Sequence, residues 1–134
     1  MSQENVEVVR KSLEAFQRGQ FDSVTTELWD SEGEWMPAMA GVVEDKVYRG
    51  HAGLRRYFDE LFESFSKVRP HDTEFRDLGN RVLALYRLSV RGRDSGVAID
   101  QQGGTVYELR GGKIVRGRSY LSHGEALKAV GLED

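Results

Sequence analysis

Apolar residues recur at helical spacing in two separate parts of the chain. Val6, Val9 and Leu13 begin the first stripe, with charged residues between them, and they predict an amphipathic helix over residues 4–18. The second stripe predicts a helix with a wide aromatic face, which suits a helix that covers a pocket. Its residues are Leu54, Tyr57, Phe58, Leu61, Phe62 and Phe65.

The segment between these two helices is expected to consist of short elements. Asp22 is a good N-cap residue and predicts a short helix from there to Trp29. Residues 33–37, GEWMP, predict a short extended segment, and residues 38–46 are expected to form a loop. Residues 47–49 predict a brief strand that leads into the aromatic helix.

The second half of the chain changes to apolar runs that are separated by glycine-containing turns, which is typical of strands. Ser122 and Glu125 then form a capping box, and this predicts a short C-terminal helix. Helices followed by a run of strands indicate an α+β domain rather than alternating βαβ units. The predicted strands cover residues 71–78, 81–90, 97–109 and 113–121.

The turn at Gly111-Gly112 decides which residues of the last two strands face inward. A two-residue loop would pair Arg110 with Lys113, whereas a three-residue loop would pair Leu109 with Lys113. We favour the three-residue loop because it gathers small and apolar residues on the inner face. That face would hold Thr105, Tyr107, Leu109, Val115, Gly117, Ser119 and Leu121, and the outer face Glu108, Arg116, Arg118 and Tyr120.

Composition limits the class of protein. The chain has 134 residues, of which 39% are hydrophobic and 31% charged, and this predicts one globular domain over residues 1–134. The net charge of −3 is too small to suggest a nucleic-acid partner, and no cysteine is present for a disulfide or a thiolate. No signal peptide or membrane-length apolar run is evident, so a soluble, cytoplasmic protein is expected.

The order of these elements resembles the nuclear transport factor 2-like superfamily, and within it the SnoaL-like (polyketide cyclase-like) family. The resemblance covers residues 8–127, through VVRKSLEAFQRGQFDSV, EWMP, VYRGHAGLRRYFDELF, LGNRVLAL and YELRGGKIVRGRSYLSHGEAL. It implies a cone-shaped α+β barrel, in which a curved antiparallel sheet wraps around helices and one internal pocket. It also implies homodimers that form through the outer face of the sheet.

The family includes isomerases, polyketide cyclases, epoxide hydrolases, dehydratases and non-catalytic binding domains, and a shared fold does not choose among them. Placed on the ketosteroid isomerase pattern, Ser12, Met36 and Thr105 stand where that enzyme needs a tyrosine, a base and a second acid. Methionine cannot abstract a proton, so isomerase activity of this kind is not expected.

Asp100 and His51 are the first catalytic candidates if the protein is an enzyme that uses general acid–base chemistry. Strict alternation from Thr105 puts Asp100 on the outer face, where it would pair with an arginine, whereas a bulge at Gly103-Gly104 would turn it inward. His51 begins the aromatic helix and either points to solvent or faces the mouth of the pocket. The three histidines lack the spacing of metal ligands, and neither a metal nor a cofactor is expected.

The pocket is expected to be mostly apolar with a few hydroxyl groups, as is typical of a small-molecule site. A protein that binds or acts on a small hydrophobic metabolite is the first hypothesis, and a non-enzymatic ligand-binding or dimerisation module is the second. A titratable group that faces the pocket would favour the enzyme, whereas apolar and hydroxyl groups alone would favour binding. The predicted lining is Trp35, Met36, Tyr48, Tyr57, Phe58, Phe62, Tyr86, Thr105, Tyr107 and Ser119.

Overall fold

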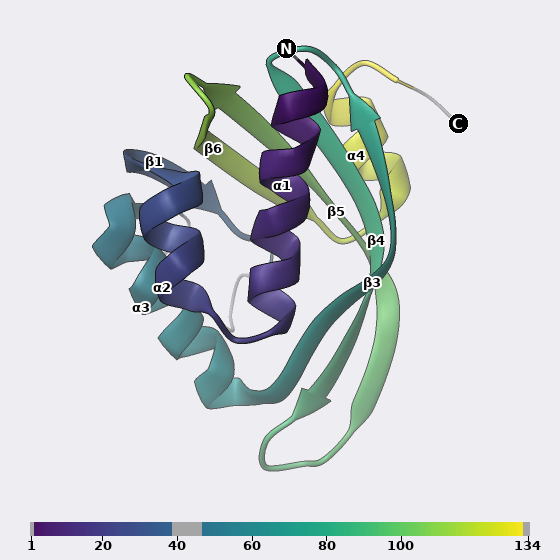
Figure 1. The fold of residues 1–134 in the computed structure, drawn as a ribbon. Helices are drawn as coiled ribbons and strands as arrows, with labels where there is room; N and C mark the ends of the chain where they lie inside the picture. The colour runs from purple at the N-terminus through teal and green to yellow at the C-terminus, as the bar shows by residue number, and fades with distance from the viewer. Residues whose placement is uncertain (1, 39–46, 133–134) are drawn as a thin grey trace.

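Six strands in the order β2-β1-β6-β5-β4-β3 form the sheet on which the computed structural model is built (Figure 1). The structure describes residues 2–38 and 47–132. Its helices are α1 (Ser2–Gln17), α2 (Phe21–Ser23), which continues as a π-helical turn (Val24–Leu28), α3 (Gly50–Ser64) and α4 (His123–Ala129). Its strands are β1 (Trp29–Met36), β2 (Tyr48–Arg49), β3 (Phe65–Asp77), β4 (Arg81–Gly92), β5 (Ala98–Arg110) and β6 (Lys113–Tyr120).

The sheet is strongly curved, and helices cover both of its faces (Figure 1). Helices α1 and α3 lie on the concave side, whereas α4 packs on the opposite face, where Ala126 and Leu127 contact Leu83 and Leu85 of β4. The expected α+β cone is therefore confirmed. One pair departs from the antiparallel expectation, because β1 runs parallel to β6. The long connection that a parallel pair requires is supplied by the elements between these two strands.

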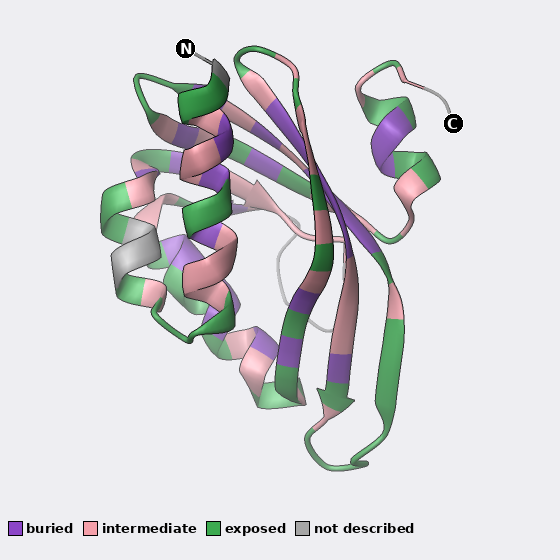
Figure 2. Ribbon diagram, turned by 45° about the vertical axis from the view of Figure 1, so that its right-hand side comes forward, coloured by how far each residue is buried: buried purple, intermediate pink, exposed green. Residues whose placement is uncertain are grey.

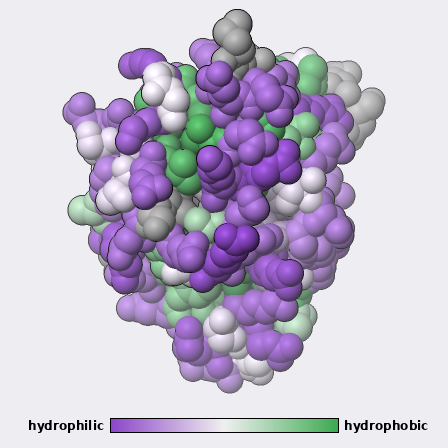
Figure 3. Space-filling model, viewed as in Figure 1, coloured by the Kyte–Doolittle hydropathy of each residue, from purple (hydrophilic) through white to green (hydrophobic). Residues whose placement is uncertain are grey.

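The amphipathic patterns explain how the helices pack on this sheet. Val9 of α1 is fully buried against the inner residues of β4, Val82 and Ala84. Figure 2 shows buried residues along one stripe of α1 and on the central strands, where β4 is buried without interruption from Val82 to Tyr86. On the face that carries α1, polar side chains make up most of the surface (Figure 3). No helix in the two described ranges is long and apolar enough to cross a membrane.

Several predicted boundaries differ from the observed ones. The predicted helix from Asp22 ends at Leu28, because Trp29 already pairs with Ile114 and begins β1. That strand extends the predicted GEWMP segment toward the N-terminus. Strand β3 begins at Phe65 and not at residue 71, since Phe65 already pairs with Gly92 of β4. Of the predicted loop, residues 39–46 lie outside the described part of the chain.

The hairpin between β5 and β6 corrects the predicted loop. Gly111 and Gly112 have φ angles of +59° and +77°, as a two-residue type I′ turn requires, and Arg110 pairs with Lys113. The prediction of a three-residue loop was wrong. A bulge then places Leu109 opposite Ile114 and Glu108 opposite Arg116, with Val115 as the extra residue.

This bulge restores the predicted faces from Glu108 and Arg116 to Thr105 and Ser119. Thr105 pairs with Ser119 and Tyr107 with Gly117, so all four share the inner face as expected. Tyr120, which was predicted on the outer face, packs with the Leu83 cluster there but also borders the cavity on the inner side. In β6, close to the turn, the predicted inward residue is wrong. Ile114 is fully buried and takes the inward place that was predicted for Val115.

Gly103 and Gly104 do not form the bulge that would turn Asp100 inward, because β4 and β5 pair without a shift from Arg81–Glu108 to Arg91–Ala98. The two glycines are needed for close packing instead. A Cβ atom at Gly103 would lie 2.5 Å from the Tyr86 ring, and one at Gly104 would lie 2.8 Å from the Cβ of Ala126 in α4. Strand β5 has no side chains at these two positions because the Tyr86 ring of β4 occupies the space on one face and α4 occupies it on the other.

Candidate functional site

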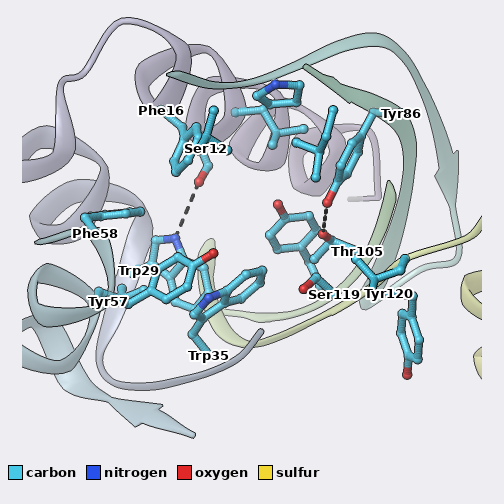
Figure 4. A pocket seen from close by; sticks show the side chains of 17 residues that line it. Ser12, Phe16, Trp29, Trp35, Tyr57, Phe58, Tyr86, Thr105, Ser119 and Tyr120 are labelled. Atoms are coloured by element: carbon cyan, nitrogen blue, oxygen red, sulfur yellow. Dashed lines mark hydrogen bonds between the residues drawn. The ribbon is translucent and has the colours of Figure 1, made fainter. Parts of the chain in front are cut away.

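A cavity lies between the concave face of the sheet and helices α1 and α3 (Figure 4). Its volume is about 90 Å³. Strands β4, β5 and β6 provide one wall, and α1, β1 and α3 provide the other. The lining is mainly aromatic, with Phe16, Trp29, Trp35, Tyr57, Phe58, Tyr86, Tyr107 and Tyr120, and its hydroxyl residues are Ser12, Thr105 and Ser119.

Most polar groups in this wall are already hydrogen-bonded within the protein. The hydroxyls of Tyr86 and Thr105 lie 2.7 Å apart, and the backbone N–H of Ala38 donates to Ser119 Oγ at 2.8 Å. Trp29 Nε1 donates to Ser12 Oγ at 3.4 Å. The indole of Trp35 differs, because its Nε1 is buried and has no hydrogen-bond partner among the described residues.

The buried tyrosines of the cavity, Tyr57, Tyr86 and Tyr107, have raised pKa values and remain protonated at neutral pH. Burial raises the pKa of Tyr86 to about 12, against the smaller opposing effect of its hydrogen bond with Thr105. Burial raises the pKa of Tyr57 and of Tyr107 as well. These hydroxyls can therefore donate hydrogen bonds to a bound molecule, but they are too weakly acidic to supply a phenolate base.

No Asp, Glu, His, Lys or Arg is among the lining residues within ranges 2–38 and 47–132. A general base needs a pKa near the working pH and must reach the proton that it removes. The described wall of the cavity offers no such group. What it offers is aromatic contact area and neutral hydrogen-bonding groups.

Most of the residues predicted to line the pocket do so, and their role in binding stays a prediction. Trp35, Tyr57, Phe58, Tyr86, Thr105, Tyr107 and Ser119 face the cavity.

Three of the predicted residues lie elsewhere. Met36 lines a neighbouring hollow that shares Ser119, Tyr120 and Leu121 with the cavity. Tyr48 is fully buried and its hydroxyl donates to Glu60. Phe62 packs in an aromatic cluster with Phe16 and Phe21.

Sequence reasoning missed Ser12 and Trp29 as lining residues. Ser12 carried a usable signal, since it is a polar residue that lies three positions after Val9 and next to Leu13 on the apolar stripe of α1. It is buried, and its hydroxyl accepts the Trp29 hydrogen bond. Trp29 was expected to end a helix, and only the strand that begins there turns its ring toward Tyr107.

Asp100 lies on the outer face of the sheet, as strict alternation predicts, because no bulge intervenes. Its carboxylate accepts hydrogen bonds from Arg87 Nε at 2.5 Å and Ser89 Oγ at 2.9 Å, and it lies 2.8 Å from His71 Nε2. The hydrogen bond from Arg87, followed by those from His71 and Ser89, lowers the pKa of Asp100 to about 2. The sheet separates this carboxylate from the cavity, so Asp100 cannot contact a molecule bound there.

His51 also lies apart from the described lining of the cavity. It is partly buried at the start of α3, and its Nε2 lies 3.0 Å from the backbone oxygen of Trp29. The histidine thus joins the start of a helix to the first residue of β1. Because Trp29 lines the cavity, this contact helps to position a cavity residue.

A curved, unclosed sheet that packs on helices around an aromatic cavity is the arrangement of NTF2-like domains. Solved structures with this fold are similar to the present chain. TerC, co-crystallised with polyporic acid, matches with a TM-score of 0.80 at 19% identity, over 89% of this chain and 92% of that one. An NTF2-like protein of unknown function from Burkholderia pseudomallei K96243 matches with a TM-score of 0.79 at 20% identity, over 96% and 98% of the two chains. A proposed polyketide cyclase from Xanthomonas campestris pv. campestris matches with a TM-score of 0.77 at 21% identity, over 92% and 93%.

The family is shown by the sequence itself. The profile of the SnoaL-like domain matches residues 9–117, so the chain belongs to the SnoaL-like family. A search of curated proteins gives no match. The structural neighbours are too distant in sequence to show more than the shared fold.

Proposed function

We propose that this protein binds a small, uncharged and mostly apolar molecule in its cavity, and that it does so without general acid–base catalysis by the cavity wall. The observation that carries the proposal is the described lining, which is aromatic, aliphatic and hydroxylic, with no ionisable carboxylate, imidazole, amine or guanidinium. Of the two hypotheses from the sequence, this composition favours ligand binding.

The chemistry of the wall also limits the charge of the ligand. An ion that is transferred from water into an apolar cavity loses its hydration, and this costs far more than hydroxyl groups return unless an opposite charge lies nearby. The described wall contains no such charge. A neutral molecule with a few polar atoms is the chemistry that fits.

The size of the cavity favours a compact ligand. Its volume of about 90 Å³ is on the order of the ~150 Å³ cavity that accepts benzene in another protein. This space suits a single ring, and a second ring would extend toward the neighbouring hollow that shares Ser119, Tyr120 and Leu121 with the cavity. TerC, a protein of the same fold, was co-crystallised with polyporic acid, and this supports a small organic ligand for the present protein.

Intrinsic fluorescence tests this proposal directly, since the chain has two tryptophans and both line the cavity. We would titrate the protein with indane, a neutral two-ring hydrocarbon, and with 1-indanone, its ketone. Saturable quenching or a spectral shift is the expected result. Isothermal titration calorimetry would then give the stoichiometry.

A matched pair of variants locates the binding site. Ser119→Phe adds a ring on the inner face of β6 and is expected to weaken binding at least tenfold. Arg116→Phe adds the same ring to the exposed outer face of the same strand and is expected to leave binding unchanged. No saturable response from either probe would overturn the proposal, and so would equal affinity in the two variants.

A further inference from the structure

Trp35 carries an unsatisfied hydrogen-bond donor in the wall of the cavity. Its Nε1 is buried and has no partner within the part of the chain that the structure describes. Buried tryptophan N–H groups normally find an acceptor. An exception inside a cavity points to an acceptor that arrives with a bound molecule.

Trp29 provides an internal comparison for this feature. The two indole rings meet edge to face, with centroids 6.1 Å apart and an interplanar angle of 89°. Trp29 Nε1 donates to Ser12 Oγ, so its hydrogen bond is made within the protein. The two tryptophans share the cavity and differ in that Trp35 has no such partner.

The surrounding residues hold the Trp35 ring in place. Tyr57 packs against it edge to face, with centroids 5.6 Å apart. On another side, a Cβ at Gly117 would come within 2.8 Å of Trp35 Cε3, so the ring lies almost on the backbone of β6. An indole confined in this way cannot turn freely to find an acceptor elsewhere in the protein.

Tyr57 supplies a second donor close to the first. In Figure 4 the Tyr57 hydroxyl and the Trp35 indole nitrogen point toward the same part of the cavity. Burial raises the pKa of Tyr57, against the smaller opposing effect of the nearby Trp35 indole, so its hydroxyl keeps its proton at neutral pH. The two groups lie close together, but the Trp35 N–H does not meet the Tyr57 oxygen in hydrogen-bond geometry. One oxygen atom of a ligand has two lone pairs and can accept from both groups.

We propose that the molecule bound in this cavity carries an uncharged oxygen acceptor, of the ketone or ester carbonyl type, and that this oxygen accepts the hydrogen bond of Trp35 Nε1. The inference rests on the proposed function and specifies its ligand class. Removal of such an acceptor leaves a buried donor unpaired, and the loss of affinity for that change is about tenfold or more.

The decisive experiment compares indane with 1-indanone in the wild-type protein, Trp35→Phe and Trp29→Phe, with affinities from calorimetry. The wild type is expected to bind the ketone about tenfold more tightly than the hydrocarbon. Trp35→Phe keeps an aromatic ring but loses the donor, so its preference should fall to less than threefold. Trp29→Phe removes the indole that already has a partner; because Trp29 also lines the cavity, it should weaken the binding of both probes alike and keep the ratio of their affinities.

The outcomes separate the two proposals. If neither probe binds to the wild type, the proposed function fails and this inference fails with it. If both probes bind and Trp35→Phe keeps the full preference for the ketone, only the role of Trp35 is overturned.

A second measurement needs no variant. The two indole N–H groups give two signals in a ¹⁵N–¹H spectrum, and contacts with the Tyr57 ring identify that of Trp35. Saturation with 1-indanone should move the Trp35 proton downfield and slow its exchange with water, whereas indane should do neither. Equal changes with the two probes, or no change with either, would contradict the proposed hydrogen bond.

Discussion

The hydrogen bond between Tyr86 and Thr105 lies at the centre of the cavity wall, and replacing Thr105 with Val removes it at nearly constant volume. Thr105 is fully buried, Tyr86 is 6% exposed, and their hydroxyls are 2.7 Å apart. The substitution leaves the Tyr86 hydroxyl without its partner, and an orphaned buried group costs about 1–3 kcal/mol. Because Tyr86 faces a cavity that can admit water, we expect the lower part of this range, about 1–2 kcal/mol.

A double-mutant cycle makes this reasoning quantitative. Tyr86→Phe removes the same hydrogen bond from the Thr105 hydroxyl, which keeps Tyr107 as a neighbouring group, and should cost about 1 kcal/mol. The double variant leaves neither hydroxyl behind, so it should be more stable than the sum of the single costs predicts, by about 1 kcal/mol. Urea unfolding followed by tryptophan fluorescence gives the three free energies, provided that the m values agree. If the free-energy cost of the double variant equals the sum of the two single costs within about 0.3 kcal/mol, the two hydroxyls do not interact and the prediction is wrong.

Alkaline pH tests the same pair in another way. The pKa of Tyr86 is raised by burial from 10.0 to about 12, so the folded protein holds this proton more tightly than the unfolded chain. The stability that comes from keeping Tyr86 protonated in the folded state is fully present below pH 10, and it is lost as the pH rises through 12. The stability of the wild type should therefore approach that of Tyr86→Phe between neutral pH and pH 11 in the same unfolding assay. A constant difference would contradict the raised pKa.

Four further predictions follow from the structure. Ile114→Ala should cost about 2–5 kcal/mol in urea unfolding and Val115→Ala much less, since the bulge turns Ile114 inward; equal costs would contradict the register. Arg93→Ala should lower stability by about 1–2 kcal/mol, because its guanidinium donates to the backbone oxygen of Phe62 at 2.6 and 2.9 Å at the end of α3; an unchanged melting temperature would count against this role. Asp100→Asn should leave the affinity for indane and 1-indanone unchanged and lower the melting temperature, and a large loss of binding would show that Asp100 acts on the cavity. A homodimer is expected from the family resemblance, and a monomer in light scattering at high concentration would rule it out.

The sequence predicted those elements whose signals are local. The apolar stripe that begins at Val6 and Val9 predicted the first helix, and both residues lie in the core. The predicted cap of the last helix is also observed, because the Ser122 side chain accepts a hydrogen bond from the Glu125 backbone N–H. The inner face of β5 and β6 from Thr105 to Ser119 was predicted by alternation along the hairpin, and Tyr86 and Thr105 were both expected in the lining. Such patterns depend on the chain within a few residues of each position.

The features that the sequence did not predict depend on distant partners. Nothing near Val115 signals the bulge, which exists because Ile114 fits between Leu109 and the core while Arg116 pairs with Glu108. Gly103 was considered as the site of a bulge, whereas it lies against the ring of a residue on another strand. The free N–H of Trp35 is likewise a property of the assembled cavity and leaves no trace in the local sequence.

The two adjacent glycines of β5 have a consequence for how this protein can change. Gly103 lies against the Tyr86 ring in the cavity and Gly104 against α4 on the other face, while His123 at the start of α4 bonds the backbone oxygen of Tyr86 at 2.8 Å. A larger residue at either position would need a matching change in a different layer of the molecule. These contacts couple the shape of the cavity to the packing of the C-terminal helix, so a change in one layer requires a change in the other.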